Sequence, residues 1–258
     1  MLLVIDVGNT QTVLGLYDHE LLAGSWRLTT RRDRTLDETR LWLTGLLNLD
    51  GFDHERVTAL AVSSVVPSVT ATLRDAGERM VGDQVLVIEP GVKTGMPIQI
   101  DNPREVGADR VVNSVAAREK YGTPVIVVDF GTSTNFDVVG PGGEYLGGVI
   151  SPGLAISTNA LVSGTAALRN VEFIPPRNPI GKGTVEAIQS GAIYGHAGLV
   201  DGIMERLVAE LEGDVKRIAT GGLASTIVPH CSSVETVDEY LTLEGLRMIY
   251  ELNAEEEP

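Results

Sequence analysis

The alternation of apolar and polar residues predicts short strands separated by amphipathic helices. Apolar runs closed by glycine or polar residues are typical of strands, and apolar residues three and four apart are typical of helices. The runs place strands at residues 2–7, 12–17, 21–29, 58–64, 84–89, 124–129, 144–150 and 216–220. The spacing places helices at residues 37–49, 68–80, 102–120, 184–211 and 243–252. Four glycines along 184–211 predict a break or close packing there, and residues 254–258 are expected to fray.

The first strand and the strand at residues 124–129 end in the same short motif. Asp6-x-Gly8-Asn9-Thr10 closes one, and Asp129-x-Gly131-Thr132-Ser133 closes the other, at an offset of 123 residues. At that offset Leu14 and Leu16 fall opposite Asp137 and Val139, so the following strands match in position more than in residue type. One such motif could arise by chance. Two, each opening a hairpin at the head of one half, predict a duplicated strand–turn–strand–strand unit.

The chemistry of these motifs points to phosphate and metal binding. An aspartate at the end of a buried strand is costly unless it is paired or hydrogen-bonded. Gly8 and Gly131 allow tight turns whose N–H groups can face a phosphate, and the carboxylates of Asp6 and Asp129 can position a metal ion. Ordinary turn hydrogen bonding remains the alternative for the serine and threonine side chains.

Composition narrows the class of protein. The chain has 258 residues, enough for one large or two modest domains, and a net charge of −15. This charge disfavours binding to nucleic acids or anionic membranes. A single cysteine, Cys231, excludes an intramolecular disulfide and a cysteine zinc site. The N-terminus lacks a signal-peptide pattern, and no apolar run reaches membrane-spanning length, so a soluble cytoplasmic protein is expected.

Several other site patterns do not occur in the sequence. Gly181-Lys182-Gly183-Thr184 lacks the upstream glycine of a P-loop, and no G-x-G-x-x-G follows the first strand. No G-x-S-x-G is present, which disfavours a serine hydrolase. The four histidines are scattered without metal-ligand spacing, so each is expected to be a surface or satisfied residue.

The paired hairpins resemble the two phosphate motifs of the acetate and sugar kinase, Hsp70 and actin superfamily. Ala219-Thr220-Gly221-Gly222, after a predicted strand, is similar to that superfamily's adenosine motif. The resemblance implies an α/β fold of two duplicated actin-like (ribonuclease H-like) domains, each a mixed sheet flanked by helices. A turn-like interval at residues 120–124 sets the expected domains at 1–120 and 121–258.

Further motifs resemble one family of that superfamily, the type III pantothenate kinases. They occur in the family's order and span almost the whole chain, and the segment with Gly107-Ala108-Asp109-Arg110 is the most specific. The motifs are Asn102 to Asn113, Gly147-Gly148-x-Ile150-x-Pro152-Gly153, Gly181-Lys182-x-Thr184 and Leu241 to Leu246. The resemblance implies ATP-dependent phosphorylation of pantothenate, the first step of coenzyme A synthesis. It also implies a homodimer, Mg²⁺, and a monovalent cation, K⁺ or NH₄⁺.

The same resemblance assigns roles to individual residues. Asp109 matches the general base, and Asp129 matches the ligand of the monovalent cation. The residues that match the ATP site are Asp6, Val7, Gly8, Asn9, Thr10, Gln11, Thr12, Val13, Thr132, Gly221 and Gly222. The residues that match the pantothenate site are Ile100, Gly107, Ala108, Asp109, Arg110 and Thr184.

Two of these positions leave alternatives open. Ile100 stands where the family often has a tyrosine, so an apolar wall is kept and a hydroxyl donor is lost. Arg110 could hold a carboxylate or phosphate, or pair with Glu105 or Asp109 at the surface. The alternative functions are a non-catalytic, nucleotide-binding accessory homologue and a kinase for another small molecule.

Overall fold

The computed structural model describes residues 1–254 of the chain, which form two compact units. The first unit contains residues 1–96, 101–116 and the segment from Leu241 onward, and the second contains residues 97–100 and 117–240. The domains expected at 1–120 and 121–258 stay a prediction. The contacts add that the chain returns to the first unit at Leu241.

The first unit is built on a five-stranded mixed sheet with strand order β3-β2-β1-β4-β5. β1 pairs antiparallel with β2 and parallel with β4. Its strands are β1 (Leu2–Val7), β2 (Gln11–Asp18), β3 (Leu21–Thr29), β4 (Ala59–Ser64) and β5 (Val85–Val87). Its helices are α1 (Leu36–Leu49), α2 (Pro67–Val81), the start of α3 (Ala108–Tyr121), α7 (Leu241–Ala254), and two 3₁₀ turns, η1 (His54–Arg56) and η2 (Pro103–Glu105).

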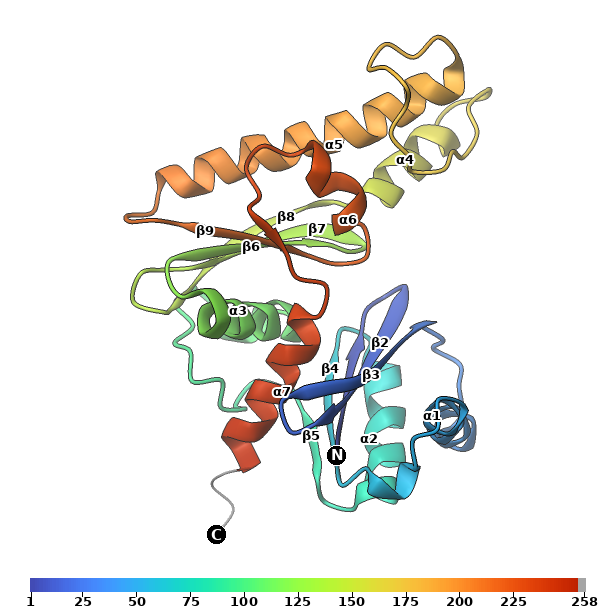
Figure 1. Ribbon diagram of the computed structural model, residues 1–258, viewed down its shortest axis with the longest axis vertical. Helices are drawn as coiled ribbons and strands as arrows, with labels where there is room; N and C mark the ends of the chain where they lie inside the picture. The colour runs from blue at the N-terminus through green and yellow to red at the C-terminus, as the bar shows by residue number, and fades with distance from the viewer. Residues whose placement is uncertain (255–258) are drawn as a thin grey trace. The chain divides into compact units, whose positions relative to one another are not determined.

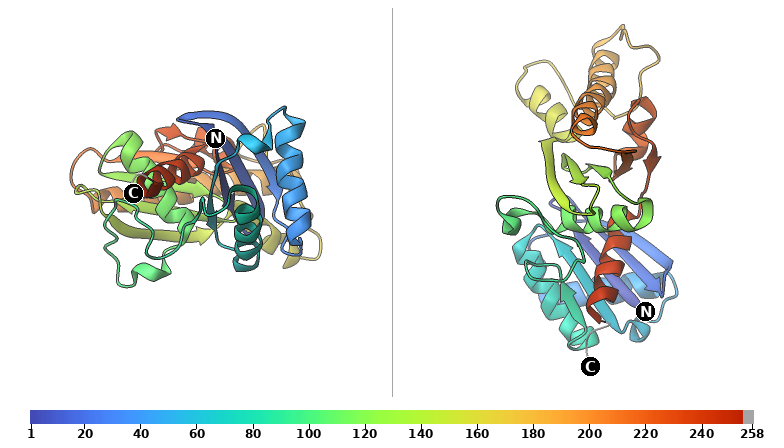
Figure 2. Two further views of the ribbon diagram at one scale, coloured as in Figure 1. Left: turned by 90° about the horizontal axis from the view of Figure 1, so that it is seen from below. Right: turned by 90° about the vertical axis from the view of Figure 1, so that its left-hand side faces the viewer.

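Side chains that alternate along these strands divide between the two faces of the first sheet. Leu3, Ile5 and Leu14 belong to a buried cluster with Leu43 of α1 and Leu73 of α2. α7 lies along the other face (Figure 2). There Gly15 leaves room for a leucine of α7, because a Cβ at this glycine would stand 3.0 Å from Leu243 Cδ1. The sheet is therefore covered by helices on both sides.

The second unit repeats this topology in β10-β9-β6-β7-β8 (Figure 1). β6 pairs antiparallel with β7 and parallel with β9, as β1 does with β2 and β4. Its strands are β6 (Val125–Phe130), β7 (Ser133–Val139), β8 (Tyr145–Pro152), β9 (Lys216–Thr220) and β10 (Thr236–Val237). Its helices are the end of α3, α4 (Leu154–Ser163), α5 (Thr184–Ala209), α6 (Ala224–Ile227) and the 3₁₀ turn η3 (Val228–His230). This confirms the expected α/β fold of two mixed sheets flanked by helices.

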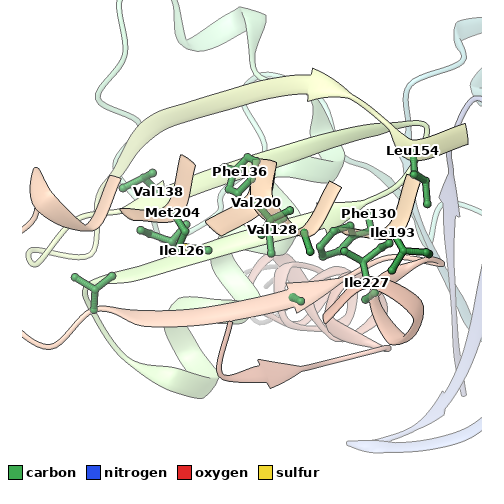
Figure 3. Close-up of a cluster of buried hydrophobic side chains, with 14 residues drawn as sticks. Ile126, Val128, Phe130, Phe136, Val138, Leu154, Ile193, Val200, Met204 and Ile227 are labelled. Atoms are coloured by element: carbon green, nitrogen blue, oxygen red, sulfur yellow. The ribbon is translucent and has the colours of Figure 1, made fainter. Parts of the chain in front are cut away.

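One face of the second sheet packs against α5. Val128, Phe130 and Phe136 from the sheet meet Ile193 and Val200 of this helix in a buried cluster (Figure 3). α5 is one helix of 26 residues, so the expected break is wrong. Three of its glycines, at 191, 195 and 198, have open space where a Cβ would point, so close packing does not require glycine at these positions.

The duplication is closer in the structure than in the sequence alignment. Asp6 pairs with Val13 across the first hairpin, and Asp129 pairs with Asn135 across the second. The offset is therefore 123 up to the turn and 122 after it, because the second turn is one residue shorter. At this corrected offset Leu14 and Leu16 match Phe136 and Val138, which are both buried, so the pairing with Asp137 and Val139 is wrong.

Even an irregularity is repeated. The β2–β3 register shifts between Leu16 and Tyr17, and the β7–β8 register shifts between Val138 and Val139. A bulge adds one residue to one strand of a pair and bends it. Its presence at equivalent positions extends the duplication beyond the hairpin turns.

Two expected boundaries also change. The helix expected at 102–120 is divided into η2 and α3, with Gly107 between them, and α3 begins at Ala108. Asn102 caps the 3₁₀ turn by accepting a hydrogen bond from Arg104 N at 3.3 Å. α4 was missed, because its residues show little separation into polar and apolar faces. The fraying expected at 254–258 lies almost wholly outside the described residues.

Candidate functional site

The first hairpin places Asp6 at the end of a central strand. Its turn is closed by Gly8 N, which donates to Gln11 O at 2.9 Å, and Asn9 and Thr10 are exposed at the tip. Thr30 supports this turn from the segment after β3: its Oγ1 donates to Gly8 O at 2.7 Å and its N donates to Thr10 O at 2.9 Å. The tip therefore presents exposed polar residues on a fixed backbone.

The second hairpin has the same plan with a tighter turn. Gly131 N donates to Ser133 O at 3.0 Å, and Gly131 and Thr132 are exposed. The next residue, Thr134, is buried, and its Oγ1 lies 2.9 Å from His196 Nε2 on α5. Burial lowers the pKa of His196, which favours the neutral imidazole in this hydrogen bond. His196 is thus a satisfied core residue, as expected.

Each hairpin aspartate stands beside a hydroxyl residue of the neighbouring parallel strand. Asp6 is in register with Ser63 of β4, and Asp129 with Thr220 of β9. Ser63 Oγ and Asn135 Oδ1 are buried and have no hydrogen-bond partner among the described residues. These atoms can take a ligand or its water, so the residues present fit a polar ligand. Sequence reasoning missed Ser63, although a hydroxyl residue at the end of an apolar strand was a usable signal.

The glycines after β9 allow the backbone to pass close to Asp129. Gly221 has φ +94°, and a Cβ there would collide with Asp129 Oδ1 and with the backbone of Phe130. Gly222 follows and is exposed. The structure therefore brings the predicted adenosine motif and the second aspartate together in one place, which only glycine permits at position 221.

The Gly-Ala-Asp-Arg segment forms the beginning of α3. Asp109 is the second residue of the helix, and its Oδ1 accepts from Arg110 N at 3.0 Å. A Cβ at Gly107 would stand 2.5 Å from that oxygen, so glycine leaves room for the carboxylate. Burial raises the pKa of Asp109, and the hydrogen bond and charge of Arg110 partly oppose it. A carboxyl group whose pKa is raised by burial is a candidate for a functional residue.

The other predicted substrate residues lie on separate elements. Ile100 belongs to the second unit, where its Cγ2 would stand 3.5 Å from a Cβ at Gly147 of β8. Thr184 is exposed at the first residue of α5, and Lys182 N donates to Glu186 Oε2 at 3.2 Å. Of the alternatives for Arg110, Glu105 Oε1 accepts instead from Asn102 Nδ2 at 2.6 Å.

Within residues 1–254, no three His, Cys, Asp or Glu side chains are grouped so that they could hold a metal ion. No helix in the same range has the length and apolar character needed to cross a bilayer.

Comparison with known proteins gives a consistent family. The model of the type III pantothenate kinase family matches residues 2–206. A Geobacter sulfurreducens protein named Type III pantothenate kinase is 52% identical over 255 residues, covering 99% of this chain and 100% of that protein. Proteins of the same name from Myxococcus xanthus and Moorella thermoacetica are 51% and 50% identical over 253 residues each, covering 98% of this chain and 99% and 100% of theirs.

Solved structures share the fold at low sequence identity. Component A of (R)-2-hydroxyglutaryl-CoA dehydratase from Acidaminococcus fermentans superposes with a TM-score of 0.57 at 14% identity, covering 98% of each chain. The inorganic polyphosphate/ATP-glucomannokinase of Arthrobacter sp. strain KM gives 0.52 at 15% identity, covering 97% of this chain and 98% of that one. At this identity the likeness shows the fold alone.

Proposed function

Because this chain belongs to the type III pantothenate kinase family, we propose that it transfers the γ-phosphoryl group of ATP to pantothenate, with Asp109 as general base. Family membership makes the chain a kinase that acts on pantothenate, in the synthesis of coenzyme A. The observation that carries the proposed base is the position of Asp109 at the start of α3, where burial raises its pKa. A base is most effective when its pKa approaches the working pH.

In the proposed reaction Asp109 aims the primary hydroxyl of pantothenate and accepts its proton as the new O–P bond forms. The bond between the γ-phosphorus and the bridging oxygen breaks, and ADP leaves with the electron pair. Bound ATP supplies the phosphoryl group, and its Mg²⁺ offsets the charge on the phosphates. Arg110 follows Asp109 and offers a guanidinium to the pantothenate carboxylate or to a phosphate. Gly107 keeps the space that the Asp109 carboxylate occupies.

The two hairpins are proposed to bind the nucleotide. The exposed tip of the first, Asn9 and Thr10, supplies backbone N–H groups for phosphate oxygens, and Asp6 would hold Mg²⁺ through water. Thr132 supplies a backbone N–H group for phosphate oxygens in the second hairpin. Gly221-Gly222 receives the adenosine. The fit rests on the buried, partnerless Ser63 Oγ and Asn135 Oδ1 beside the two aspartates.

Three further features are proposed from the family resemblance. Asp129 holds K⁺ or NH₄⁺, so we expect that turnover depends on one of these ions and that Asp129→Ala removes this dependence with most of the activity. Ile100 and Thr184 contact pantothenate. The chain forms a homodimer, and exposed apolar side chains in the second unit favour an interface there. Among them are Leu146, Ile150, Ile156, Leu161, Ile174, Ile180 and Val185.

A coupled assay of ADP release tests the function directly. We expect release with pantothenate and none with a panel of other alcohols and sugars. Asp109→Asn should lower kcat by about 10²-fold or more, the range for losing a general base, while ATP binding stays close to wild type. Asp75→Asn, an exposed aspartate on α2, is the matched control.

The Asp109→Asn variant should also differ from the wild type in the pH dependence of its stability. A carboxyl group whose pKa is raised in the folded state destabilises the protein as the pH rises through that pKa. Asp109→Asn should therefore raise the melting temperature at pH 7 and lose this advantage near pH 4.

Near wild-type turnover of Asp109→Asn in the coupled assay would contradict the assignment of Asp109 as the general base. No ADP release with pantothenate in any cation would favour the accessory homologue instead.

A further inference from the structure

Three arginines gather beside the first hairpin, on the segment between β3 and α1. Arg31, Arg32 and Arg34 line a small pocket together with side chains of α1 and α2, among them Trp42 and Thr72. The whole chain carries 20 basic residues against 35 acidic ones. Three arginines within four residues, with Asp33 between them, are therefore a local feature that opposes the overall charge.

Two carboxylates accompany these charges, Asp33 within the segment and Glu38 in the first turn of α1. None of the three guanidinium groups makes a salt bridge anywhere in residues 1–254. The acidic neighbour Glu38 is already engaged, because it accepts from Thr35 N at 2.8 Å and from Thr35 Oγ1 at 3.0 Å in the capping box of α1. Burial and the charge of Arg31 lower the pKa of Arg34, and the charges of Glu38 and Asp33 partly oppose this. The three arginines outnumber these two carboxylates, so the cluster keeps a net positive charge.

One residue that lines the pocket, Trp42, has an indole N–H without an acceptor among the described residues. Arg34 Cζ lies 4.9 Å from the ring centroid of Trp42, which holds the guanidinium against α1. Trp42 Nε1 is buried and has no hydrogen-bond partner in the described chain. A buried donor without an acceptor is costly, so an oxygen-rich ligand would relieve it. Guanidinium groups pair with phosphate through two parallel N–H···O bonds, and three of them favour a multiply charged phosphate over a carboxylate.

The pocket lies on the face of the sheet opposite to Asp6. Ile5 and Val7 point into the buried cluster with α1 and α2, and side chains alternate along a strand, so Asp6 points to the other face. The pocket residues Thr12, Trp42 and Leu73 lie on the side of α1 and α2. The link to the turn is Arg32, whose Nη2 donates to Asn9 Oδ1 at 3.0 Å.

We propose that Arg31, Arg32 and Arg34 form a binding site for free inorganic phosphate, separate from the Asp6 face of the first hairpin. Because Arg32 also holds Asn9, phosphate in the pocket alters the support of the turn. Any effect of phosphate on nucleotide affinity must then be matched by an equal effect of nucleotide on phosphate affinity. Binding of inorganic phosphate at this site does not depend on kinase activity, because phosphate is the only ligand involved.

Calorimetric titration of the full chain with inorganic phosphate tests this site. We expect binding to the wild type at millimolar concentrations and about tenfold weaker binding in Arg31→Gln and Arg34→Gln. Arg31 is exposed, so its variant should keep a melting temperature close to that of the wild type. Arg79→Gln removes one exposed charge near the other end of α2 and should bind phosphate within about twofold of wild type.

A second arm separates free phosphate from a nucleotide phosphate. We expect phosphate to bind, with altered affinity, when ADP is saturating. Complete displacement by ADP would place the phosphate in the nucleotide site and overturn the separate assignment. Equal phosphate affinity in Arg31→Gln, Arg79→Gln and wild type would overturn the site, as would no binding to the wild type.

Discussion

The two hairpins carry an equivalent threonine that finds a different partner in each unit. Thr12 and Thr134 each follow a turn, at the corrected offset of 122 residues. Thr12 Oγ1 lies 2.9 Å from Thr30 Oγ1, in the segment that follows the next strand. Thr134 Oγ1 lies 2.9 Å from His196 on a helix 62 residues away. In the second unit Gly153 stands at the position equivalent to Thr30, and it has no hydroxyl that could bond to Thr134.

The difference shows that the backbone arrangement of the hairpin is repeated in both units, whereas the side-chain hydrogen bonds that hold the hairpin in place are not. The first hairpin is fastened by a neighbouring segment, since Thr30 also binds Gly8 O and Thr10 O. The second hairpin is fastened to α5, and Phe130 packs against the His196 ring with centroids 6.1 Å apart. Changes in α5 should therefore reach the second hairpin, while the first responds to the segment at residues 30–34.

The strongest test of the second hairpin is Gly221→Ala. The methyl group would collide with Asp129 and Phe130, and φ +94° is unfavourable for alanine. We expect a loss of about 3 kcal/mol in the free energy of unfolding, from backbone strain and overpacking together. Gly45→Ala, in α1 with open space at its Cβ, should instead stabilise by about 0.5–1 kcal/mol. Chemical denaturation measures both, and equal effects would refute the close approach.

Removing each threonine hydroxyl compares the supports directly. Thr134→Val leaves a buried His196 nitrogen unsatisfied, so we expect a cost of about 2 kcal/mol. Thr12→Val should cost about 1 kcal/mol, because Thr30 keeps its bond to Gly8 O. A double-mutant cycle of Thr134→Val with His196→Leu should recover part of the loss. Additive losses in that cycle would show that the hydrogen bond contributes nothing.

The turn glycines separate ligand binding from folding. A Cβ at Gly131 meets no atom closer than 3.6 Å, so Gly131→Val should stay folded while its exposed side chain weakens ATP binding by about tenfold or more. A Cβ at Gly8 would stand 3.1 Å from Gln11 O, so Gly8→Val should lose stability as well. Lys182→Ala, an exposed control, should change ATP affinity by less than about twofold. The reverse ranking in calorimetry would point to a lysine-centred phosphate site.

The smallest effect is a dependence on pH that only the second hairpin shows. Burial holds the pKa of His196 below its usual 6.5, so the unfolded chain binds a proton that the folded protein excludes. This stability is complete above about pH 6.5 and is lost as the pH falls toward the lower folded-state pKa. His196→Gln should flatten the decline in unfolding free energy between pH 7 and 5, whereas Thr12→Val should leave its slope unchanged. Parallel slopes in wild type and His196→Gln would contradict the assignment.

Much of the fold was predictable because burial imposes a local pattern. The strands 21–29 and 216–220 have the predicted bounds, and the two-sheet duplication follows from the repeated Asp-x-Gly. The sequence did not reveal that the second turn is one residue shorter than the first, since offsets of 122 and 123 differ only in the register of the strands. That register is set by pairing with β6 across the sheet, which short-range pattern does not record.

The candidate site was predictable only where a motif carries its own chemistry. Asp109 and the turn glycines are found by their sequence neighbours. Ser63 and His196 reach the hairpins through the parallel pairing of β4 and through the packing of α5, over separations that no local motif spans. The arginine segment contains no recognisable motif, because its pocket requires side chains from α1 and α2.

The last helix has a consequence for synthesis on the ribosome. α7 supplies Leu243, Leu246 and Ile249 to the first unit, although more than a hundred residues of the second unit are made before it. Domains usually fold in the order in which they emerge. Here the sheet of the first unit keeps one face uncovered until α7 has been made, so the unit that begins first is completed after the second unit. A nascent chain arrested before Leu241 should therefore depend on holding chaperones for the N-terminal part.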